Sequence, residues 1–518
     1  MNHFLSGILK LALLEGQAAT LVTDRLLGER FVKGRRWAFV VFAALATFAW
    51  CNYGAFRGNG QLVHQWEQFH FYLGAKYIEE VGNFDLYKAV LLADRESARA
   101  LVGLTTTRDL HTFEVIPVEQ ALEDAPRVRA RFTDARWEEL KRDWELLLRT
   151  PASWPNILND HGNTSSPAWA LLAHPLAELF SPTRAAQVFF ACLDFALLIG
   201  LWWFAFRTFG TQLAAVALTV FASVPIWFDY LAGSFLRQDW TFAIGMALCF
   251  LHKKRYATAG AFFGFAVATK LFPLFFGVAL LLRALLEVVR ERKVPSRYVR
   301  FGVGALSCLA TCILLSSAMF GGPKVWREYK ERIDVTRGEK FYANQYSLRT
   351  VFLQVATSSP AQFLSWPFAP AAIHQGAPQV KLSDFRVRFF LVQMLFTLLV
   401  ALTLARADDV SAFAMGPLLV FTWVVVNMYY WNMLGFLALG LARRKDRSSF
   451  FALLGLHAIL ALFYLYQHTN HGYAEGYFVA LLLCIGLVGF AAAEVVVLWR
   501  ERFFPAMLLR PKPPSPPP

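Results

Sequence analysis

Two short stretches of the sequence carry side chains that can do chemistry beside long apolar runs. In WEQFH (66–70), Glu67 and His70 are three residues apart, so a helix would place a carboxylate and an imidazole on one face. Both groups can act as general bases. In FGFAVATKLFPLFFGV (263–278), Lys270 interrupts a run that suits lipid. A charge at membrane depth is costly and is usually paired, directed into a cavity, or functional.

Other polar residues also occur where apolar runs end. Arg237 can hold a phosphate bidentately and Lys270 as a point charge, and a carboxylate beside them can take the proton of an attacking hydroxyl. This combination suits transfer of a group from a lipid phosphate to an alcohol, because cations stabilise the leaving phosphate. Lys270 can alternatively extend to lipid headgroups, and Arg237 can alternatively form a structural ion pair with Asp239. The further candidates are Gln238, Asp239, Asn344, Gln345, Arg349 and Asn432.

The composition indicates a membrane protein. Hydrophobic residues make up 56% of the 518 residues and charged residues 17%, and several apolar runs reach the ~20 residues that span a bilayer. The formal charge of +14 would suggest a nucleic-acid partner in a soluble protein. Here the lysines and arginines cluster between apolar runs, as in cytoplasmic segments, so we expect membrane lipids around the chain and no nucleic acid. The clusters are 25–36, 252–255, 290–300, 443–447 and 500–502.

The order of apolar and polar segments predicts an all-α polytopic fold of about 12 transmembrane helices, with both termini inside. Within the first outer loop, PAWALLAHPLAELF (167–180) is too short to span, so we expect an interfacial helix there. The predicted segments are a cytoplasmic N-terminal interfacial segment (1–36), a transmembrane module (37–320) that includes an outer loop (56–183), a second outer loop (321–386), C-terminal transmembrane helices (387–500) and a disordered Pro-rich tail (501–518).

Two apolar segments contain polar breaks. Basic residues flank 256–288, which predicts a hairpin of two short helices with Lys270 at its outer tip and a helix break at Pro273. The segment 410–442 is similarly interrupted by NMYYWN (427–432). Irregular backbone at membrane depth is tolerated where it lines a cavity. The breaks therefore predict a cavity that opens to the outer side.

Four stretches follow one another in an order typical of a known family. They are WEQFHFYLGAKYIEEVGNFDLYKA (66–89), SSPAWALLAHPLAELF (165–180), SFLRQDWTFAIGMALCFLHKKRYATAGAFFGFAVATKLFP (234–273) and YANQYSLRTVF (342–352). Together they resemble the GT-C superfamily of polyprenyl-phosphate-sugar-dependent glycosyltransferases, and within it the family 87, mannosyltransferase type. The chain departs from that pattern at three places. Glu67 stands where the family usually has its catalytic Asp, Arg-Gln-Asp (237–239) replaces a Gly-Gln segment, and Trp431-Asn432 stands where relatives often carry W-x-H.

The resemblance implies a GT-C-like bundle with interfacial helices in the large first outer loop, in a bacterial inner (plasma) membrane with the active site facing outside. It further implies inverting transfer of a hexose or pentose, with mannose favoured, from a polyprenyl-phosphate donor to a lipid or glycan acceptor. Glu67 would be the general base, with His70 as the alternative. The donor phosphate would be bound by Arg237, Lys270 and Arg349. The substrates would be positioned by Gln238, Asp239, Asn344, Gln345 and Asn432. No cofactor is implied.

Two other interpretations of the same residues stay open. A transporter or flippase of polyprenyl-linked glycans would use the same cations without needing a base, and transporters often contain interrupted helices. A metal-assisted transferase would use Glu67 and His70 as ligands of a divalent ion. Two ligands are too few to predict a metal, so we favour a site without one.

Overall fold

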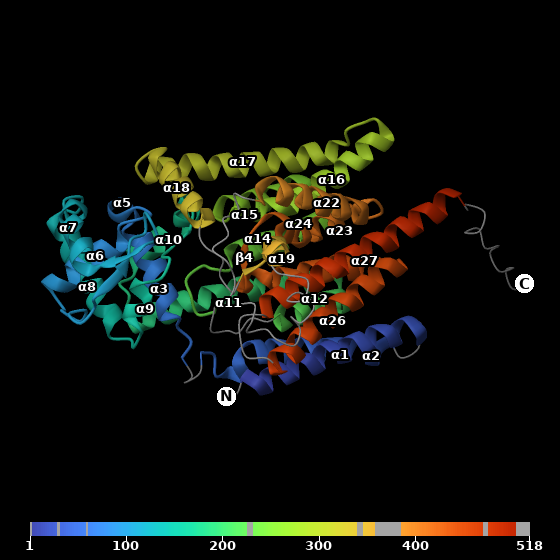
Figure 1. The fold of residues 1–518 in the computed structure, drawn as a ribbon, viewed down its shortest axis with the longest axis horizontal. Helices are drawn as coiled ribbons and strands as arrows, with labels where there is room; N and C mark the ends of the chain where they lie inside the picture. The colour runs from blue at the N-terminus through green and yellow to red at the C-terminus, as the bar shows by residue number, and fades with distance from the viewer. Residues whose placement is uncertain are drawn as a thin grey trace, which may run out of the picture.

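The long apolar runs form the helices of a bundle, and the first polar loop forms a smaller helical domain, the outer domain, at one end of it (Figure 1). The computed structural model describes residues 3–27, 32–57, 61–224, 232–338, 345–357, 385–469 and 475–503. Within these residues, 6 helices are long and apolar enough to cross a membrane, as expected of a multi-pass helical membrane protein. They are α1 (His3–Leu27), α11 (Arg184–Phe209), α17 (Ser296–Met319), α22 (Arg386–Leu404), α26 (Arg447–Thr469) and α27 (Glu475–Phe503).

Further helices complete the bundle and contain both predicted breaks. Two helices, α15 (Tyr256–Thr269) and α16 (Leu274–Glu291), are separated at 270–273, which confirms the first break. The second lies between α24 (Gly416–Trp423) and α25 (Leu434–Arg443), where the chain forms the strand β4 (Val426–Asn427) and the 3-10 helix η5 (Met428–Met433). The other helices are α2 (Val32–Trp50), α12 (Thr211–Ser223), α14 (Asp239–His252) and α23 (Asp409–Ala414). The predicted number of about 12 spans counted both the long helices and shorter apolar helices of this kind.

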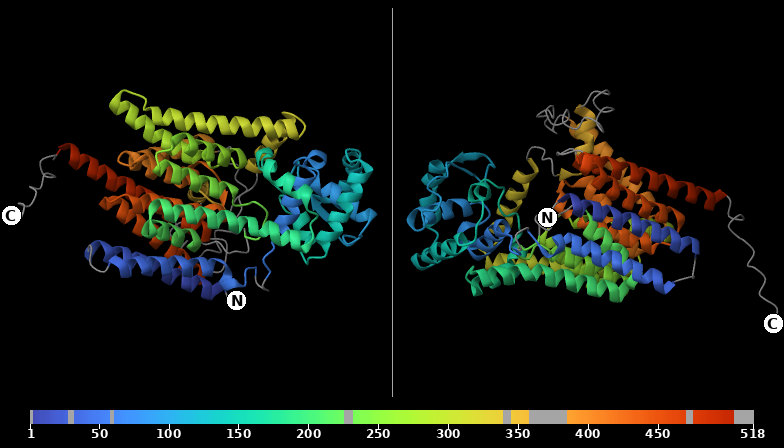
Figure 2. Two further views of the ribbon diagram at one scale, coloured as in Figure 1. Left: turned by 180° about the vertical axis from the view of Figure 1, so that it is seen from behind. Right: turned by 90° about the horizontal axis from the view of Figure 1, so that it is seen from below.

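The N-terminal helix differs from the expectation. Instead of lying at the interface, α1 packs along α2, α12 and α26. Its buried Gln17 is satisfied inside the bundle, because the side-chain amide donates to the Thr219 hydroxyl at 2.8 Å and the side-chain carbonyl oxygen lies 2.9 Å from His457 Nε2. The helix begins at the end of the bundle that carries the outer domain, whereas α27 ends at the opposite end (Figures 1 and 2). The prediction that both termini lie on one side is therefore wrong.

The outer domain has an apolar core of its own, to which Trp137, Trp144 and Trp169 contribute. The expected short helix over 167–180 is α10 (Pro167–Leu179), and Ser166 caps it by accepting the Trp169 amide at 3.2 Å. The other elements are α3 (Gln65–Gln68), the π-helix η2 (Phe69–Leu73), α4 (Gly74–Lys76), α5 (Ile78–Val81), α6 (Leu86–Glu96), α7 (Val118–Arg129), α8 (Asp134–Leu148), α9 (Trp154–Leu158) and the antiparallel pair β1 (Thr106–Arg108) and β2 (Val115–Pro117).

The second outer loop contributes α18 (Lys324–Gly338), β3 (Gln345–Tyr346) and α19 (Leu348–Thr357). Arg332 of α18 is buried and donates to Leu110 O at 2.6 Å, which ties this loop to the outer domain. The rest of the loop and the expected tail beyond 503 lie outside the described residues.

The helices α15 and α17 approach closely where glycines of α15 meet the backbone of α17. A Cβ on Gly260 would lie 2.0 Å from Phe301 O, and one on Gly264 would lie 2.3 Å from Ala305 O. Two glycines four residues apart allow helix backbones to approach in membranes. This contact holds α15, and with it Lys270 at its end, against α17.

We expect Gly264→Leu to force α15 away from α17 and to destabilise the protein by about 1–3 kcal/mol. Gly302→Leu is the matched control, because among the described residues no atom lies within 4 Å of the Cβ position at Gly302, also in a helix of this pair. The apparent melting temperature in detergent should fall only for Gly264→Leu. An equal fall for both variants would contradict the close contact.

Candidate active site

The short helix α3 places Glu67 where the outer domain meets the bundle. His64 caps the helix by accepting the Glu67 amide on Nδ1 at 3.4 Å, and the His64 amide donates to Gly233 O at 2.7 Å. Gln68 Nε2 donates to the same carbonyl at 3.3 Å. Gly233 has a φ of +80°, and a Cβ there would lie 1.8 Å from Leu62 O. This contact therefore requires glycine.

Glu67 forms an ion pair with Arg237. Arg237 Nη1 lies 3.2 Å from Glu67 Oε2, and the two side chains are 7% and 17% exposed, respectively. Ser234 donates its hydroxyl to the same carboxylate oxygen at 3.5 Å. The guanidinium lies 4.6 Å from the ring centroid of Phe71 and 5.6 Å from that of Tyr429 in η5. The structure thus brings the predicted base and a predicted phosphate ligand together.

Lys270 lies beside this pair, at the break between α15 and α16. Its backbone is extended, with φ −143° and ψ 133°, and this ends α15. The side chain is 6% exposed, and Nζ lies 6.0 Å from the centroid of the same Phe71 ring. Its charge interacts with those of Arg237, Asp239 and Glu67. The break between α15 and α16 therefore places the Lys270 cation beside Glu67, Arg237 and Asp239. We call these four residues the charged cluster.

The helix α10 anchors both segments that carry the cations. Ser166 donates its hydroxyl to Ala268 O at 2.6 Å, two residues before Lys270. Trp169 Nε1 donates to Leu236 O at 2.9 Å, next to Arg237. The Trp169 ring also packs edge-to-face on Phe71, with centroids 5.2 Å apart. A helix too short to span therefore positions these residues from the side of the outer domain.

Asp194 of α11 also supports the site, and sequence reasoning missed it. Its Oδ1 accepts the Gln238 amide at 2.9 Å, which holds the turn between Arg237 and Asp239. Asp194 is buried, as are Gln238 and Asp239. A signal was present in the sequence, because a carboxylate inside a long apolar helix is costly unless it has a role.

His70 lies in the core of the outer domain. Its Nε2 is 2.7 Å from Tyr87 Oη, and Tyr87 donates to Ile157 O at 2.9 Å. Burial lowers the pKa of His70 to about 4, so the ring is neutral at pH 7. Among the residues that the structure describes, no group of three or more His, Cys, Asp or Glu side chains could hold a metal ion. Among the described residues, the structure therefore adds no third ligand to the metal site that Glu67 and His70 were considered for.

A second carboxylate, Asp160, lies near Glu67. Trp66 Nε1 donates to Asp160 Oδ2 at 2.7 Å. Burial would raise the pKa of Asp160, but hydrogen bonds from His161 and Trp66 hold that pKa below its usual value. Burial raises the pKa of Glu67, and the charge of Asp160 adds to the rise, whereas Arg237 opposes it. Of the two carboxylates, Glu67 is the better proton acceptor.

The remaining predicted residues lie on the second outer loop and the second break. Asn344 is outside the described residues, and Gln345 is described in its backbone, which pairs with Asn427 through β3 and β4. This pairing joins the second outer loop to the segment that carries Tyr429. Asn432 is buried in η5, and Arg349 is partly buried in α19.

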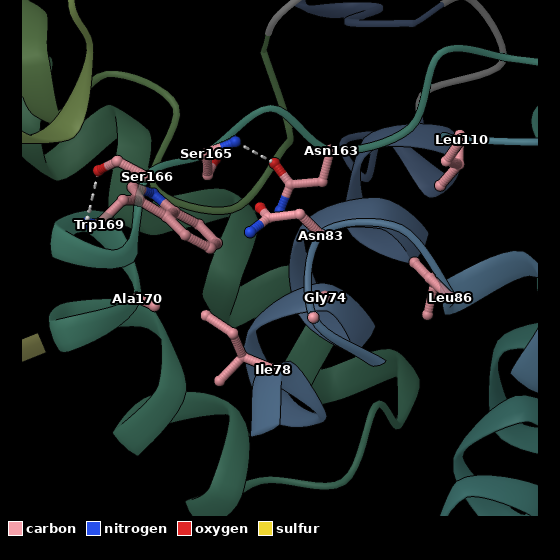
Figure 3. Close-up of a pocket in the computed structure, with 11 residues that line it drawn as sticks. Gly74, Ile78, Asn83, Leu86, Leu110, Asn163, Ser165, Ser166, Trp169 and Ala170 are labelled. Carbon is pink, nitrogen blue, oxygen red and sulfur yellow. Dashed lines mark hydrogen bonds between the residues drawn. The ribbon is translucent and has the colours of Figure 1, made fainter. Parts of the chain in front are cut away.

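A cavity in the outer domain lies next to the charged cluster, but none of the charged side chains of the cluster lines it. Figure 3 shows side chains that line it, among them Ile78, Asn83, Asn163 and Trp169. Asn163 Oδ1 accepts the Ser165 amide at 2.7 Å. The lining is apolar or neutral, which suits neither phosphate binding nor proton transfer. Trp169 is the shared wall, because it lines this cavity and also packs on Phe71.

Comparison with known proteins identifies one family. The model of Glycosyltransferase family 87 matches residues 164–426, from the residues before α10 through β4. The match includes Arg237, Lys270 and Arg349, whereas Glu67 precedes it. No curated protein and no solved structure matches the chain.

We expect Gly233→Ala to break the contact between α3 and the turn before α14. The positive φ costs about 1–2 kcal/mol for a residue with a Cβ, and the clash with Leu62 O adds to this cost. Gly54→Ala is the control, because Gly54 has a similar positive φ, +82°, but no described atom lies within 4 Å of its Cβ position. Thermal unfolding in detergent should show a markedly larger loss for Gly233→Ala. Similar losses would mean that backbone strain alone is responsible.

Proposed function

The chain belongs to glycosyltransferase family 87, and from this membership we propose that it transfers a sugar from a polyprenyl-phosphate donor to a hydroxyl of a lipid or glycan acceptor. The reaction takes place where the outer domain meets the bundle. The observation that carries the proposal is the Glu67–Arg237 ion pair at 3.2 Å, with Lys270 on the same Phe71 ring.

Glu67 is the proposed general base. It accepts the proton of the acceptor hydroxyl while that oxygen attacks the anomeric carbon from the face opposite the phosphate. The bond between the anomeric carbon and the phosphate oxygen breaks, and the configuration inverts. The negative charge that develops on the leaving polyprenyl phosphate is stabilised by Arg237 and Lys270. The shielded surroundings strengthen this stabilisation, because little water competes for either cation.

The other predicted residues have supporting roles in this proposal. Gln238 and Asp239 contact substrate from the turn that Asp194 holds. Arg349 extends the phosphate site, and Asn344, Gln345 and Asn432 complete the substrate site from the second outer loop and the second break. His70 supports the outer domain through Tyr87.

The membrane orientation follows from charge. The basic clusters at 252–255, 290–300 and 443–447 lie at helix ends remote from the outer domain, and such clusters face the cytoplasm. We therefore place the outer domain and the site outside a bacterial inner membrane, on a GT-C-like bundle of about 12 spans, with a mannose-like sugar favoured.

A flippase of polyprenyl-linked glycans is the second candidate. It is favoured by the two interrupted segments at membrane depth, because broken helices commonly form transport sites. Such a protein would need the cations but no base.

We expect Glu67→Gln to reduce turnover by roughly 100- to 10,000-fold, because the amide cannot accept the proton. Donor binding should be retained. Lys270→Ala should lose both turnover and donor binding. The measurement is transfer from radiolabelled polyprenyl-phosphate sugars in membranes, together with binding of the same donors to purified protein.

The same membranes separate the two candidates. If Glu67→Gln translocates a lipid-linked glycan as well as the wild type does, and neither transfers sugar, the flippase is correct. If activity is lost after EDTA treatment, the metal-assisted reaction regains support.

We expect Arg237→Gln to move the acid limb of the pH–rate profile to higher pH. The reaction needs the Glu67 carboxylate, so the rate falls as pH drops through its pKa. Arg237 opposes the rise of that pKa, and its removal should therefore shift the limb upward by about one unit or more. Arg349→Gln is the control, because Arg349 is not among the charges that act most on Glu67. A limb that stays in place in Arg237→Gln would mean that another group is the base.

A further inference from the structure

Asp239 is a buried carboxylate to which the proposed mechanism gives no specific partner. The residue is 3% exposed, and within the described part of the chain the Trp240 amide and the Thr269 hydroxyl lie near its oxygens, but neither donates a hydrogen bond of good geometry to them. Over the same part of the chain, Gln238 Oε1 accepts none and Lys270 Nζ donates none. Buried polar groups are nearly always hydrogen-bonded, and an unsatisfied buried charge is costly. Three adjoining groups of this kind indicate a site for a polar ligand.

The charges of the cluster divide into two pairs. Among charged groups, Arg237 acts most strongly on Glu67, whereas Lys270 acts most strongly on Asp239. Glu67 also accepts the Ser234 hydroxyl, so it is partly engaged. Asp239 and Lys270 are therefore the pair whose polar atoms suit a ligand with both hydroxyl donors and an anionic group.

Three aromatic side chains, Trp240, Phe272 and Tyr430, pack together beside this pair. The ring centroids of Trp240 and Phe272 are 4.8 Å apart, those of Phe272 and Tyr430 are 4.8 Å apart, and those of Trp240 and Tyr430 are 5.9 Å apart. Tyr430 also lies within electrostatic reach of Asp239. A few polar groups against an apolar aromatic wall are typical of small-molecule sites. They suit a sugar, which has apolar C–H faces and polar edges.

The position of Asp239 at the start of α14 is not a sufficient explanation. An acidic residue in the first turn stabilises a helix, but this effect does not require the carboxylate to be buried. It also leaves the unbonded Lys270 Nζ and Gln238 Oε1 unexplained.

We propose that Asp239 binds two neighbouring hydroxyls of the donor sugar, while Lys270 beside it holds the donor phosphate. This inference rests on the proposed function. A carboxylate can only accept hydrogen bonds, and its two oxygens match the two hydrogens of a vicinal diol. The site therefore selects a neutral sugar with an intact diol.

The test is binding to the full-length protein in detergent. The probes are polyprenyl phosphate without a sugar, a hydrolysis-resistant phosphonate analogue of the polyprenyl-phosphate hexose that the wild type transfers best, and its monodeoxy analogues. For the wild type, two deoxy analogues at adjacent positions should bind about tenfold or more weakly, as expected for lost hydrogen bonds to a charged group. Asp239→Asn should weaken binding of the complete analogue to a similar degree and leave polyprenyl phosphate unaffected.

The deoxy series also tests the contact directly. In Asp239→Asn, removal of the same two hydroxyls should cost much less than in the wild type, because the carboxylate that they contact is absent. The inference is overturned if Asp239→Asn weakens sugar-free polyprenyl phosphate as much as the sugar analogue. It is also overturned if no adjacent pair of hydroxyls matters to the wild type, a result that needs no variant to fold.

Asp409→Asn is the matched control. Asp409 is a largely buried carboxylate that accepts the Tyr256 hydroxyl at 2.6 Å. Tyr256 begins α15 and Lys270 follows its end, so the two sites are about 20 Å apart along the helix. Asp409→Asn should leave discrimination among the analogues unchanged. A wild type that neither transfers sugar nor binds polyprenyl phosphate would instead refute the proposed function itself.

Discussion

The ion pair between Glu67 and Arg237 is the contact on which the site depends, because it joins the outer domain to the bundle. Removing both charges from water is costly, and their attraction repays this cost only when the geometry is well defined. The surrounding structure provides that geometry. The Gly233 carbonyl holds α3, Asp194 holds the turn after Arg237, and Trp169 holds the residue before it. Each of these contacts connects segments far apart in the sequence.

The short helix α10 has a central part in this arrangement. The helix α10 does not span the bundle but remains beside the end of α15 and the residues before α14. Its hydrogen bonds reach the backbone next to both Arg237 and Lys270. Both cations also lie on the Phe71 ring. The distance between them is therefore set by the outer domain, and movement of that domain would change the proposed phosphate site.

Much of the fold could be predicted because its signals are local. Apolar runs marked the long helices, and Lys270 with Pro273 marked the break between α15 and α16. Charges in apolar surroundings also identified Arg237 and Lys270. The prediction for α1 was wrong because the packing of this helix depends on partners far away in the sequence, and only the tertiary structure brings Gln17 to Thr219 of α12 and His457 of α26.

The less predictable parts of the site depend on tertiary contacts or on irregular backbone. Gly233 shows no local signal, because its importance comes from the nearby Leu62 carbonyl. The expected pairing of Glu67 with His70 assumed regular α-helical spacing. The backbone instead changes to the π-helix η2 at Phe69, between the two residues, and His70 bonds to Tyr87. A period of 3.6 residues could not anticipate this change.

Two departures from the family pattern meet in the structure. Glu67 stands where the resemblance leads us to expect Asp, and Arg237 stands in place of a Gly-Gln segment; their side chains are 3.2 Å apart. An Asp on the same backbone would place its carboxylate one carbon–carbon bond, about 1.5 Å, closer to α3, and the contact with Arg237 would be lost. A glycine at 237 would leave the Glu67 carboxylate without its cation. Each residue therefore accounts for the other, and the longer carboxylate proposed as the base is suited to a site in which the cation proposed to bind phosphate also holds it in place.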